Sequence, residues 1–302
     1  MKAIIMAAGV GRRLLGLNLN KPKCLLTASG GETLIRRSVN LLVSKGISDI
    51  NVIVGYKADL IRNELNNDVT YFENPHFRTT NSIMSLWYAK DLLEDDVLLL
   101  NGDLYYEPSI LDYAINQTNP VVMLADSTRI DNADYRFGFI GDKINRFGKH
   151  LTNQETDGEY VGIVRIDECF IKTFKQTLEE MITAGKSNIW WEDVLYSFVA
   201  KQVPIHFYDV AGTFWSEVDT LQDYNYLQNW ITSQNITVSR ELIPESVEDY
   251  LNQASQGGFA DEGANRGLQE SLRDAGFYSG DIDSQIGPMS TSAIRAYQFS
   301  SN

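Results

Sequence analysis

The N-terminal residues constrain the fold of this chain more than any other segment. A short apolar run, Met1 to Met6, leads into a loop with two glycines, Gly9 and Gly11, and then into Pro22-Lys23. Glycine allows positive φ and a close approach of the backbone to a ligand, so main-chain N–H groups can face phosphate oxygens while Arg13 and Lys23 neutralise their charge. The pattern predicts a strand that opens into a phosphate-binding loop, although the G-x-x-x-x-G-K-[ST] spacing of a P-loop is absent.

The same residues resemble the signature of the nucleotidyltransferases that join a nucleoside triphosphate to a sugar phosphate or an amino-alcohol phosphate. That signature reads roughly L-A-A-G-x-G-x-R-[LM] followed by P-K, and the chain departs from it at Arg12 and Gly16, where a small Ser or Thr and a Pro are usual. A lone G-x-G is more often a plain turn from a strand to a helix. The added cations favour a triphosphate site, which the resemblance assigns to Ala7, Ala8, Gly9, Gly11, Arg13 and Lys23.

Composition sets the class of protein. With 302 residues, 43% of them hydrophobic and 22% charged, the chain can form one large soluble domain and a small one. No apolar stretch approaches the roughly 18 residues that span a bilayer, and no signal peptide is visible at the N-terminus. A net charge of −14 argues against nonspecific nucleic-acid binding. Cys24 and Cys169 are expected to be buried free thiols, and we expect a cytoplasmic protein.

Apolar, β-rich runs alternate with helical periodicity along the first part of the chain. The β-rich runs span residues 3–6, 50–54, 69–72, 97–100 and 121–124, and helical patterns span 34–45 and 82–93. This alternation predicts an α/β fold with a doubly wound, Rossmann-like mixed sheet. Ligands of such sheets collect at the carboxyl ends of strands, where the Gly9 loop and the turn at residues 101–103 are expected.

The pattern changes from about residue 133 to residue 164, where glycines and aromatic residues interrupt shorter β-rich runs. The runs at 136–140 and 159–163 predict an antiparallel β lid over the edge of the sheet. Helical patterns return at 169–184 and 191–200, and a turn with a helix at 215–230 is expected to end the large domain. The nucleotidyltransferase domain is therefore expected to span residues 1–230.

The C-terminal part has a different character. Residues 231–302 hold ten acidic and four basic side chains, and residues 231–258 are expected to form a linker. Residues 259–302 resemble a peptidoglycan-binding module of three helices, through the motif residues Leu268-Gln269, 276–278 and Ile282-Asp283. Such a small α-helical module would bind a glycan, mediate self-association, or merely pack as a minimal core.

Two aspartates are the expected metal ligands. Nucleotidyl transfer requires charge neutralisation at the triphosphate, which Mg²⁺ held by carboxylates supplies. Asp103 follows a buried strand and is placed to hold that metal, while Asp219 resembles the second metal ligand of the family. Aspartates at loop starts are otherwise turn formers or helix caps, and Glu217 competes for the role of the second carboxylate. We expect Asp103 and Asp219 to be catalytic, together with Arg13 and Lys23.

A segment near residue 80 resembles the one beside the nucleotide base in the cytidylyltransferase branch of the family. Asn74-Pro75 and residues 80–86 carry this resemblance, which covers the branch of phosphocholine and 2-aminoethylphosphonate cytidylyltransferases. It implies that Asn81, Ser82 and Ser85 contact CTP. Thr80 or Asn81 would equally serve as a plain helix N-cap.

An aromatic and acidic cluster is the candidate site for the acceptor. Cation–π attraction and a carboxylate would favour an ammonium group over a neutral sugar, with Tyr135 contributing to the cluster. Tryptophans beside an amphipathic helix are otherwise packing residues of a core. Lys149 resembles a lysine that contacts the acceptor's phosphate, or it is a solvated surface residue. The expected acceptor-binding residues are Lys149, Tyr160, Trp190, Trp191, Glu192 and Trp215.

These features predict a Mg²⁺-dependent cytidylyltransferase that joins CMP from CTP to an amino-alcohol phosphate or phosphonate and releases pyrophosphate. One alternative is the same type of enzyme with a sugar 1-phosphate or another phosphorylated small molecule as its acceptor. A second alternative is a glycan- or cell-wall-binding protein that acts through the C-terminal module.

Overall fold

The computed structural model describes residues 1–11, 21–28 and 31–242, with side chains up to residue 234, and six isolated residues nearer the C-terminus. The chain divides into two compact units, Met1–Leu227 and Gln228–Asn302. The first unit contains the sheet and the pockets described below.

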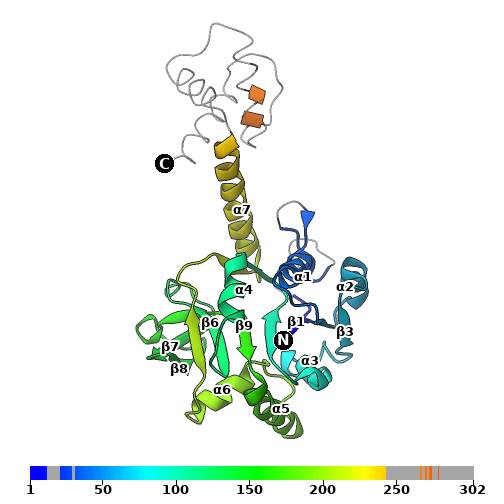
Figure 1. Ribbon diagram of the computed structural model, residues 1–302, viewed down its shortest axis with the longest axis vertical. Coiled ribbons are helices and arrows are strands. Elements are labelled where there is room, and N and C mark those ends of the chain that lie inside the picture. The colour runs from blue at the N-terminus through cyan, green and yellow to red at the C-terminus, as the bar shows by residue number, and fades with distance from the viewer. Residues whose placement is uncertain are drawn as a thin grey trace. The chain divides into compact units, whose positions relative to one another are not determined.

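Eleven strands and seven α helices lie within the described residues (Figure 1). The strands are β1 (Lys2–Ala7), β2 (Ile50–Val54), β3 (Thr70–Glu73), β4 (Val97–Asn101), β5 (Leu104–Tyr106), β6 (Val121–Asp126), β7 (Arg136–Ile140), β8 (Lys143–Phe147), β9 (Gly158–Ile166), β10 (His206–Asp209) and β11 (Trp215–Glu217). The helices are α1 (Leu34–Ser44), α2 (Ala58–Leu65), α3 (Ser82–Tyr88), α4 (Pro108–Ile115), α5 (Glu168–Thr183), α6 (Asp193–Ala200) and α7 (Leu221–Leu242). None of these helices has the length and apolar character needed to cross a bilayer.

Nine of the strands form one mixed sheet in the order β3-β2-β1-β4-β9-β6-β10-β8-β7. Strands β3, β2, β1 and β4 are parallel, and β10 is parallel to β6. Strand β9 runs antiparallel between β4 and β6. Strands β5 and β11 form a separate antiparallel pair. The α/β class with a mixed sheet, expected from the sequence, is therefore confirmed.

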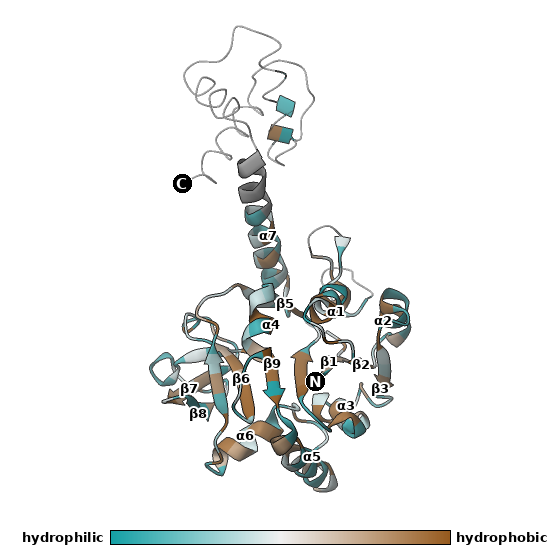
Figure 2. Cartoon of the chain, viewed as in Figure 1, coloured by the Kyte–Doolittle hydropathy of each residue, from teal (hydrophilic) through white to brown (hydrophobic). Residues whose placement is uncertain are grey.

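Helices cover both faces of this sheet because its central strands are apolar on both sides. Neighbouring residues of β1 point to opposite faces: Ile5 packs in the cluster with α1, α2 and α4, and Ile4 packs in the cluster with α3, α5 and α6. Figure 2 shows strands β1, β6 and β9 largely in the brown of apolar residues. Burial of this apolar surface from water is the main force that holds the three layers together.

The expectation that residues 159–163 form part of a lid is wrong. These residues belong to β9, all nine residues of which are buried, and the strand lies in the middle of the sheet. The glycines and aromatic residues around it suggested a short strand of a lid, whereas its charged residues are buried because their charges are compensated inside the fold. Arg165 pairs with Asp96 at 3.1 Å, and Glu159 pairs with Arg129 at 3.6 Å. Strands β7 and β8 do form the antiparallel hairpin expected near residue 136.

Other boundaries differ from the expected ones. The helix expected at 82–93 ends at Tyr88, and a short 3-10 turn follows at Lys90–Leu92. Strands β5, β10 and β11 had no clear sequence signal, since they are only three or four residues long. Helix α7 continues through residue 230, where the linker was expected to begin, and ends at Leu242.

Most of the expected C-terminal module lies outside the described residues. Of its motif residues, Gln269 and Tyr278 are buried, and the Gln269 amide donates a hydrogen bond to the Tyr278 hydroxyl at 3.2 Å. The three-helix module and its glycan or self-association role stay predictions.

Candidate active site

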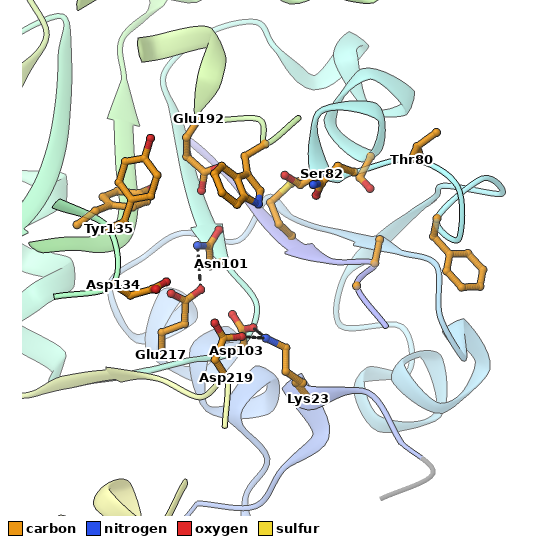
Figure 3. A pocket seen from close by; sticks show the side chains of 18 of the residues that line it. Lys23, Thr80, Ser82, Asn101, Asp103, Asp134, Tyr135, Glu192, Glu217 and Asp219 are labelled. Carbon is orange, nitrogen blue, oxygen red and sulfur yellow. Dashed lines mark hydrogen bonds and ion pairs between the residues drawn. The ribbon is translucent and has the colours of Figure 1, made fainter. Parts of the chain in front are cut away.

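A pocket of about 260 Å³ opens where β1 and β4 end (Figure 3). Residues distant in the chain converge on it because the ends of parallel strands share one edge of the sheet. The pocket is lined by Met6, Ala8, Gly9, Lys23, Phe77, Thr80, Asn81, Ser82, Ser85, Asn101, Asp103, Asp134, Tyr135, Lys149, Tyr160, Trp190, Glu192, Tyr196, Glu217 and Asp219. A second pocket shares Gly9, Lys23, Asp103 and Asp219 with the first and adds Ala7, Gly11 and Gly102.

The glycine loop after β1 comes very close to Lys23. Gly11 has a φ of 64°, and a Cβ atom there would lie 2.5 Å from Cγ of Lys23. Glycine is therefore required on both conformational and steric grounds. The aliphatic part of the Lys23 side chain therefore packs against the loop, and both the loop and Lys23 line the second pocket.

Lys23 lies between two carboxylates. Its Nζ atom forms ion pairs with Asp103 and with Asp219, and the three side chains are each 16 or 17% exposed. Burial alone would lower the pKa of Lys23, but the charges of the two aspartates outweigh it and raise that pKa above its ordinary value. Lys23 therefore stays a cation, and it offsets the repulsion between the two carboxylates.

The pairing of β5 with β11 brings Asp219 to Asp103. Glu217 of β11 lies opposite Leu104 of β5, and the Val218 N–H donates a hydrogen bond to the Asp103 carbonyl oxygen at 3.0 Å. The Asp223 carboxylate then accepts hydrogen bonds from the Asp219 N–H at 3.1 Å and from the Thr220 N–H at 2.7 Å. These contacts fix the turn that carries Asp219 directly before α7 begins.

The start of α3 forms the side of the pocket next to the glycine loop. Fully buried Asn74 organises this side, since its amide donates to the Ser85 hydroxyl at 2.9 Å and its side-chain oxygen accepts from the His76 N–H at 2.9 Å. The Asn81 side chain accepts from the Ser82 N–H at 2.8 Å, so it caps the helix as well as lining the pocket. The N-cap role of Asn81 is confirmed, and its contact with CTP stays a prediction.

Aromatic rings form the opposite wall. Tyr196 of α6 stacks on Tyr135, with ring centroids 5.0 Å apart and planes 9° apart. The Trp190 ring meets Tyr135 edge-on at 5.9 Å and is 43% exposed. Lys149 forms an ion pair with Asp134 at 2.6 Å, and its Nζ atom lies 5.6 Å from the centroid of the Trp190 ring.

The carboxyl groups of Glu192, which is buried, and Glu217, which is half-buried, lie on either side of Asn101 (Figure 3). The Asn101 amide donates to Glu217 at 3.3 Å, and the Trp191 indole N–H donates to the Asn101 side-chain oxygen at 3.4 Å. Burial raises the pKa of Glu192 to about 8, and it also raises the pKa of Glu217, with the charges of Asp103 and Asp219 adding to the rise. The hydroxyl of Tyr160 is buried beside them without a hydrogen-bond partner among the described residues.

Residues 3–188 match the MobA-like NTP transferase domain, which is more than half of the chain. The chain belongs to the MobA-like NTP transferase family. It is thus a nucleotidyltransferase, as expected from the glycine loop and the two aspartates.

Named relatives of this NTP transferase include several cytidylyltransferases. It is 37% identical over 228 residues to a 2-aminoethylphosphonate cytidylyltransferase of Lancefieldella rimae, over 73% of this chain and 89% of that protein. It is 25% identical over 254 residues to a CTP:phosphoglutamine cytidylyltransferase of Campylobacter jejuni, over 74% of this chain and 97% of that protein. The solved structure of a CTP:phosphocholine cytidylyltransferase from Streptococcus pneumoniae shares the fold, with a TM-score of 0.64, 23% identity and coverage of 76% and 98%.

The structure of the transferase brings most of the predicted site residues together. The two pockets between them contain the predicted nucleotide-binding residues Ala7, Ala8, Gly9, Gly11, Asn81, Ser82 and Ser85, the predicted catalytic residues Lys23, Asp103 and Asp219, and the predicted acceptor-binding residues Lys149, Tyr160, Trp190 and Glu192. Arg13 lies outside the described residues. The roles of all these residues stay predictions.

Two predicted acceptor residues of the transferase lie elsewhere. Trp191 is 1% exposed in the core between the sheet and α6, and it contacts the pocket residues Asn101 through its indole N–H and Ser82 through its backbone N–H. Trp215 is 2% exposed in the core on the other face of the sheet. For these two tryptophans, packing in a core describes the position better than an aromatic cage does.

Several pocket residues of the transferase carried little signal in the sequence. Phe77, Asn101, Asp134 and Tyr196 line the main pocket. Asn101 directly precedes the Gly102-Asp103 turn, and Tyr196 follows Glu192 by four positions in α6, so the strand end and the helical spacing were available signals. Asp134 lies in a loop and could be found only from the fold.

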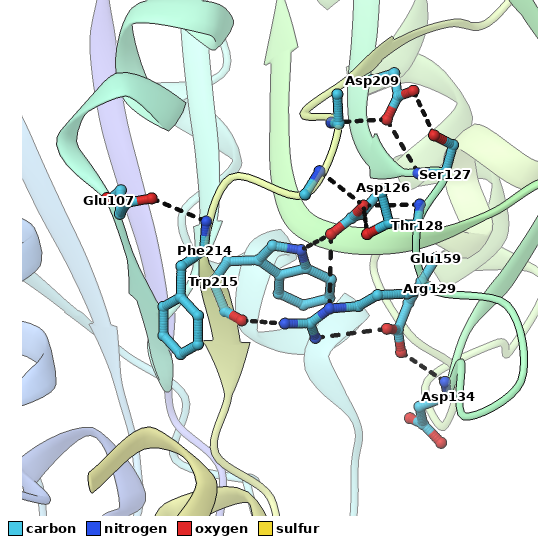
Figure 4. A network of polar contacts seen from close by, with 12 residues as sticks. Glu107, Asp126, Ser127, Thr128, Arg129, Asp134, Glu159, Asp209, Phe214 and Trp215 are labelled. Carbon is cyan, nitrogen blue, oxygen red and sulfur yellow. Dashed lines mark hydrogen bonds and ion pairs between the residues drawn. The ribbon is translucent and has the colours of Figure 1, made fainter. Parts of the chain in front are cut away.

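A polar network holds the strand that leads to Asp219 (Figure 4). The Arg129 guanidinium lies 3.9 Å from the centroid of the Trp215 ring and donates a hydrogen bond to the Trp215 carbonyl oxygen. It also lies 3.6 Å from both Asp126 and Glu159, and Asp126 accepts from the Trp215 indole at 2.9 Å. The network thus joins β6, β9 and β11 behind the pocket.

Proposed function

We propose that this nucleotidyltransferase transfers CMP from CTP to an amino-alcohol phosphate or phosphonate and releases pyrophosphate. The observation that carries the proposal is that one pocket joins the Lys23, Asp103 and Asp219 cluster to an acidic, aromatic wall. The names of the cytidylyltransferase relatives support CTP as the donor.

The charge of the pocket supports a cationic acceptor. Five carboxylates but only two ammonium groups line its described part: Asp103, Asp134, Glu192, Glu217 and Asp219 face Lys23 and Lys149. A neutral sugar would gain little from these carboxyl groups, whereas a cation bound beside Glu192 and Glu217, whose pKa values are raised by burial, would be stabilised by their ionised forms. The acidic wall therefore fits an ammonium-bearing acceptor better than a sugar 1-phosphate.

The donor set at the other end fits Mg²⁺. Asp103 and Asp219 contact one ammonium group, so their oxygens lie close enough to share one cation. No group of three potential metal-ligating side chains occurs among the described residues, but Mg²⁺ in phosphoryl-transfer sites is usually held by one or two carboxylates together with substrate phosphates. Mg²⁺ bound by these two aspartates would supply charge neutralisation at the triphosphate.

The protein's own contribution is binding and alignment. We assign the triphosphate to the glycine loop and Lys23, and the acceptor's phosphate or phosphonate group to Lys149.

An acceptor oxygen then forms a bond to the α-phosphorus while the bond from that phosphorus to the bridging oxygen breaks, and pyrophosphate leaves in line. The acceptor oxygen is already ionised near neutral pH, because the second pKa of a phosphate is about 6. The reaction therefore requires no general base from the pocket.

Pyrophosphate release across a grid of substrates tests this proposal. The four common nucleoside triphosphates would each be combined with phosphoethanolamine, 2-aminoethylphosphonate, phosphocholine and glucose 1-phosphate, with Mg²⁺ and with EDTA. We expect turnover with CTP, Mg²⁺ and an ammonium-bearing acceptor. Turnover confined to glucose 1-phosphate would refute the choice of acceptor, and turnover with another nucleotide alone would refute the choice of donor.

A pair of variants separates the chemistry from the fold. Asp103→Asn should reduce turnover by about a hundredfold or more, because it removes a ligand that neutralises charge in the transition state. Asp59→Asn is the matched control, since Asp59 is 95% exposed and pairs only with Arg62 across one turn of α2. Equal activity of the two variants would contradict the role of Asp103.

A further inference from the structure

The aromatic wall of the pocket has few ring faces left for a bound cation. Tyr196 stacks on Tyr135 at 5.0 Å and on Phe147 at 4.6 Å, with the planes within 11° of parallel in both pairs. Cation–π attraction requires that the cation lie over the face of a ring. Ring contacts therefore occupy the faces that Tyr196 would need to hold an ammonium group.

Trp190 is the most exposed ring of the wall, but it already has a cation near it. The Nζ atom of Lys149 lies 5.6 Å from the centroid of Trp190, and Asp134 holds that ammonium group by an ion pair at 2.6 Å. A second cation over the same ring would be repelled by Lys149. A cage of aromatic faces, which a quaternary ammonium group needs, is therefore incomplete.

Hydrogen-bond acceptors, by contrast, are plentiful in the same wall. Glu192, Glu217 and Tyr160 all line this pocket. The Tyr160 hydroxyl is buried and has no hydrogen-bond partner among the residues that the structure describes. A buried hydroxyl without a partner is costly, and because Tyr160 lines the pocket, a bound ligand can supply the missing hydrogen bond there.

We propose that the acceptor's cationic end is a primary ammonium group that donates hydrogen bonds to Glu192, Glu217 and the Tyr160 hydroxyl, an inference that rests on the proposed function. A primary ammonium carries three N–H donors, which match these three acceptors. A trimethylammonium group has no N–H donor, so it would supply none of these hydrogen bonds and would leave the Tyr160 hydroxyl without one. Sites built to hydrogen-bond a substrate reject analogues that lack the donor, and the pocket therefore selects 2-aminoethyl compounds over choline compounds.

A series of acceptors that differ only in N-methylation tests this selectivity on the unmodified protein. The series consists of phosphoethanolamine, its N-methyl and N,N-dimethyl derivatives, and phosphocholine, each with CTP and Mg²⁺. We expect kcat/KM to fall at each methylation and to be at least about thirtyfold lower for phosphocholine than for phosphoethanolamine. Equal or faster turnover of phosphocholine would overturn the inference.

A tyrosine variant tests the contribution of the hydroxyl. Tyr160→Phe should lower kcat/KM for phosphoethanolamine by about tenfold and leave that for phosphocholine within about twofold, since only the primary ammonium donates to the hydroxyl. Tyr106→Phe is the matched control, because Tyr106 is equally buried but lies on the other face of the sheet, outside both pockets. Equal losses for both acceptors in Tyr160→Phe would contradict the hydrogen bond.

The two proposals fail in different ways. Turnover of phosphocholine with CTP but not of the primary amine keeps the cytidylyltransferase function and refutes the primary-ammonium inference. Absence of turnover with every member of the series, in a preparation that uses glucose 1-phosphate, refutes both.

Discussion

The ammonium group of Lys23 forms an ion pair with the carboxylate of Asp219, which lies 196 positions later in the chain. The same ammonium group pairs with Asp103, so one cation joins the glycine loop to the end of β4 and to the turn before α7. The two ion pairs hold Lys23, the proposed phosphate-binding residue, next to Asp103 and Asp219, the proposed metal ligands, before any substrate binds.

This ion pair predicts a specific effect of Lys23→Ala. The variant should raise the KM for CTP by about tenfold to a hundredfold, because a charge-assisted contact to the triphosphate is lost. It should also lower the free energy of unfolding, because Asp103 and Asp219 then repel each other without compensation. Initial rates at varied CTP and denaturant titrations measure the two effects. Lys45→Ala is the control, since Lys45 lies outside both pockets and forms an ion pair with Asp112 at a distance of 2.6 Å. An equal rise in the KM for CTP in this variant would contradict the assignment of Lys23 to the triphosphate.

Glu192 makes stability depend on pH in a defined direction. Burial raises its pKa to about 8 in the fold, whereas a glutamate in an unfolded chain has a pKa of about 4.3. The fold favours the protonated carboxyl, so this group stabilises the protein fully below about pH 4.3, and the contribution is lost as the pH rises through about 8. Glu192→Gln should therefore be more stable than the unmodified protein at pH 9, with a smaller difference at pH 5. Denaturant titrations of both proteins at the two pH values measure this difference in stability. A difference that is the same at pH 5 and pH 9 would refute the raised pKa of Glu192.

The same carboxyl predicts how acceptor binding responds to pH. An ammonium group is attracted to the ionised form of Glu192, so KM for phosphoethanolamine should fall as the pH rises from about 7 to about 9. In Glu192→Gln this fall should be smaller, because Glu217, whose pKa is also raised, remains. Steady-state rates at saturating CTP across this range measure it, and a pH dependence that is equally large in the variant would point to another group.

Arg129 is expected to be important for stability. Arg129→Met leaves the buried carboxylates of Asp126 and Glu159 without their common cation, which should lower the free energy of unfolding by about 3 kcal/mol. Arg146→Met provides the comparison. Its guanidinium is 45% exposed and 3.9 Å from Asp157, so its loss should cost less than about 1 kcal/mol. Similar costs in denaturant titrations of the two variants would contradict the importance of the Arg129 network.

Gly162 is predicted to be required for the position of Asn101. Its φ is 91°, and a Cβ atom there would lie 3.0 Å from Leu104 and 3.3 Å from the Asn101 amide. Gly162→Ala should be destabilising and should also raise KM for the acceptor, because the amide that contacts Glu217 is displaced. Gly141→Ala isolates the conformational strain, since Gly141 has a φ of 60° and open space around it. An acceptor KM that is unchanged in Gly162→Ala would show that Asn101 has room to adjust.

The local pattern of the sequence was sufficient for the elements whose burial is simple. Strands β1 and β2 consist mostly of apolar residues, and α1 has a clear apolar stripe, so the sequence pattern indicated them within one or two residues. Strand β9 was misplaced, because glycines and aromatic residues suggested short strands of a lid, while Glu159 and Arg165 are buried in the sheet only through distant ion-pair partners. A local pattern contains no information on such partners.

The candidate site, too, could be predicted from the sequence only in part. The Gly9 loop, Lys23, Asp103 and Asp219 could be named from motifs, because their chemistry depends on residue type at short spacing. Which of two consecutive tryptophans faces the pocket could not be named. Trp190 is 43% exposed and Trp191 is 1% exposed, a difference that arises from the packing of α6 against the sheet.

The sequence by itself determined the class of fold, the positions of the main strands and the residues expected to handle the triphosphate. The tertiary structure alone decided that β9 lies at the centre of the sheet, that β5 pairs with β11, and that Glu192, Glu217 and Tyr160 share one wall with Asn101 between the two carboxylates. The physical reason is that burial and charge compensation depend on contacts between segments far apart in the chain, and these contacts form only when the whole sheet is assembled.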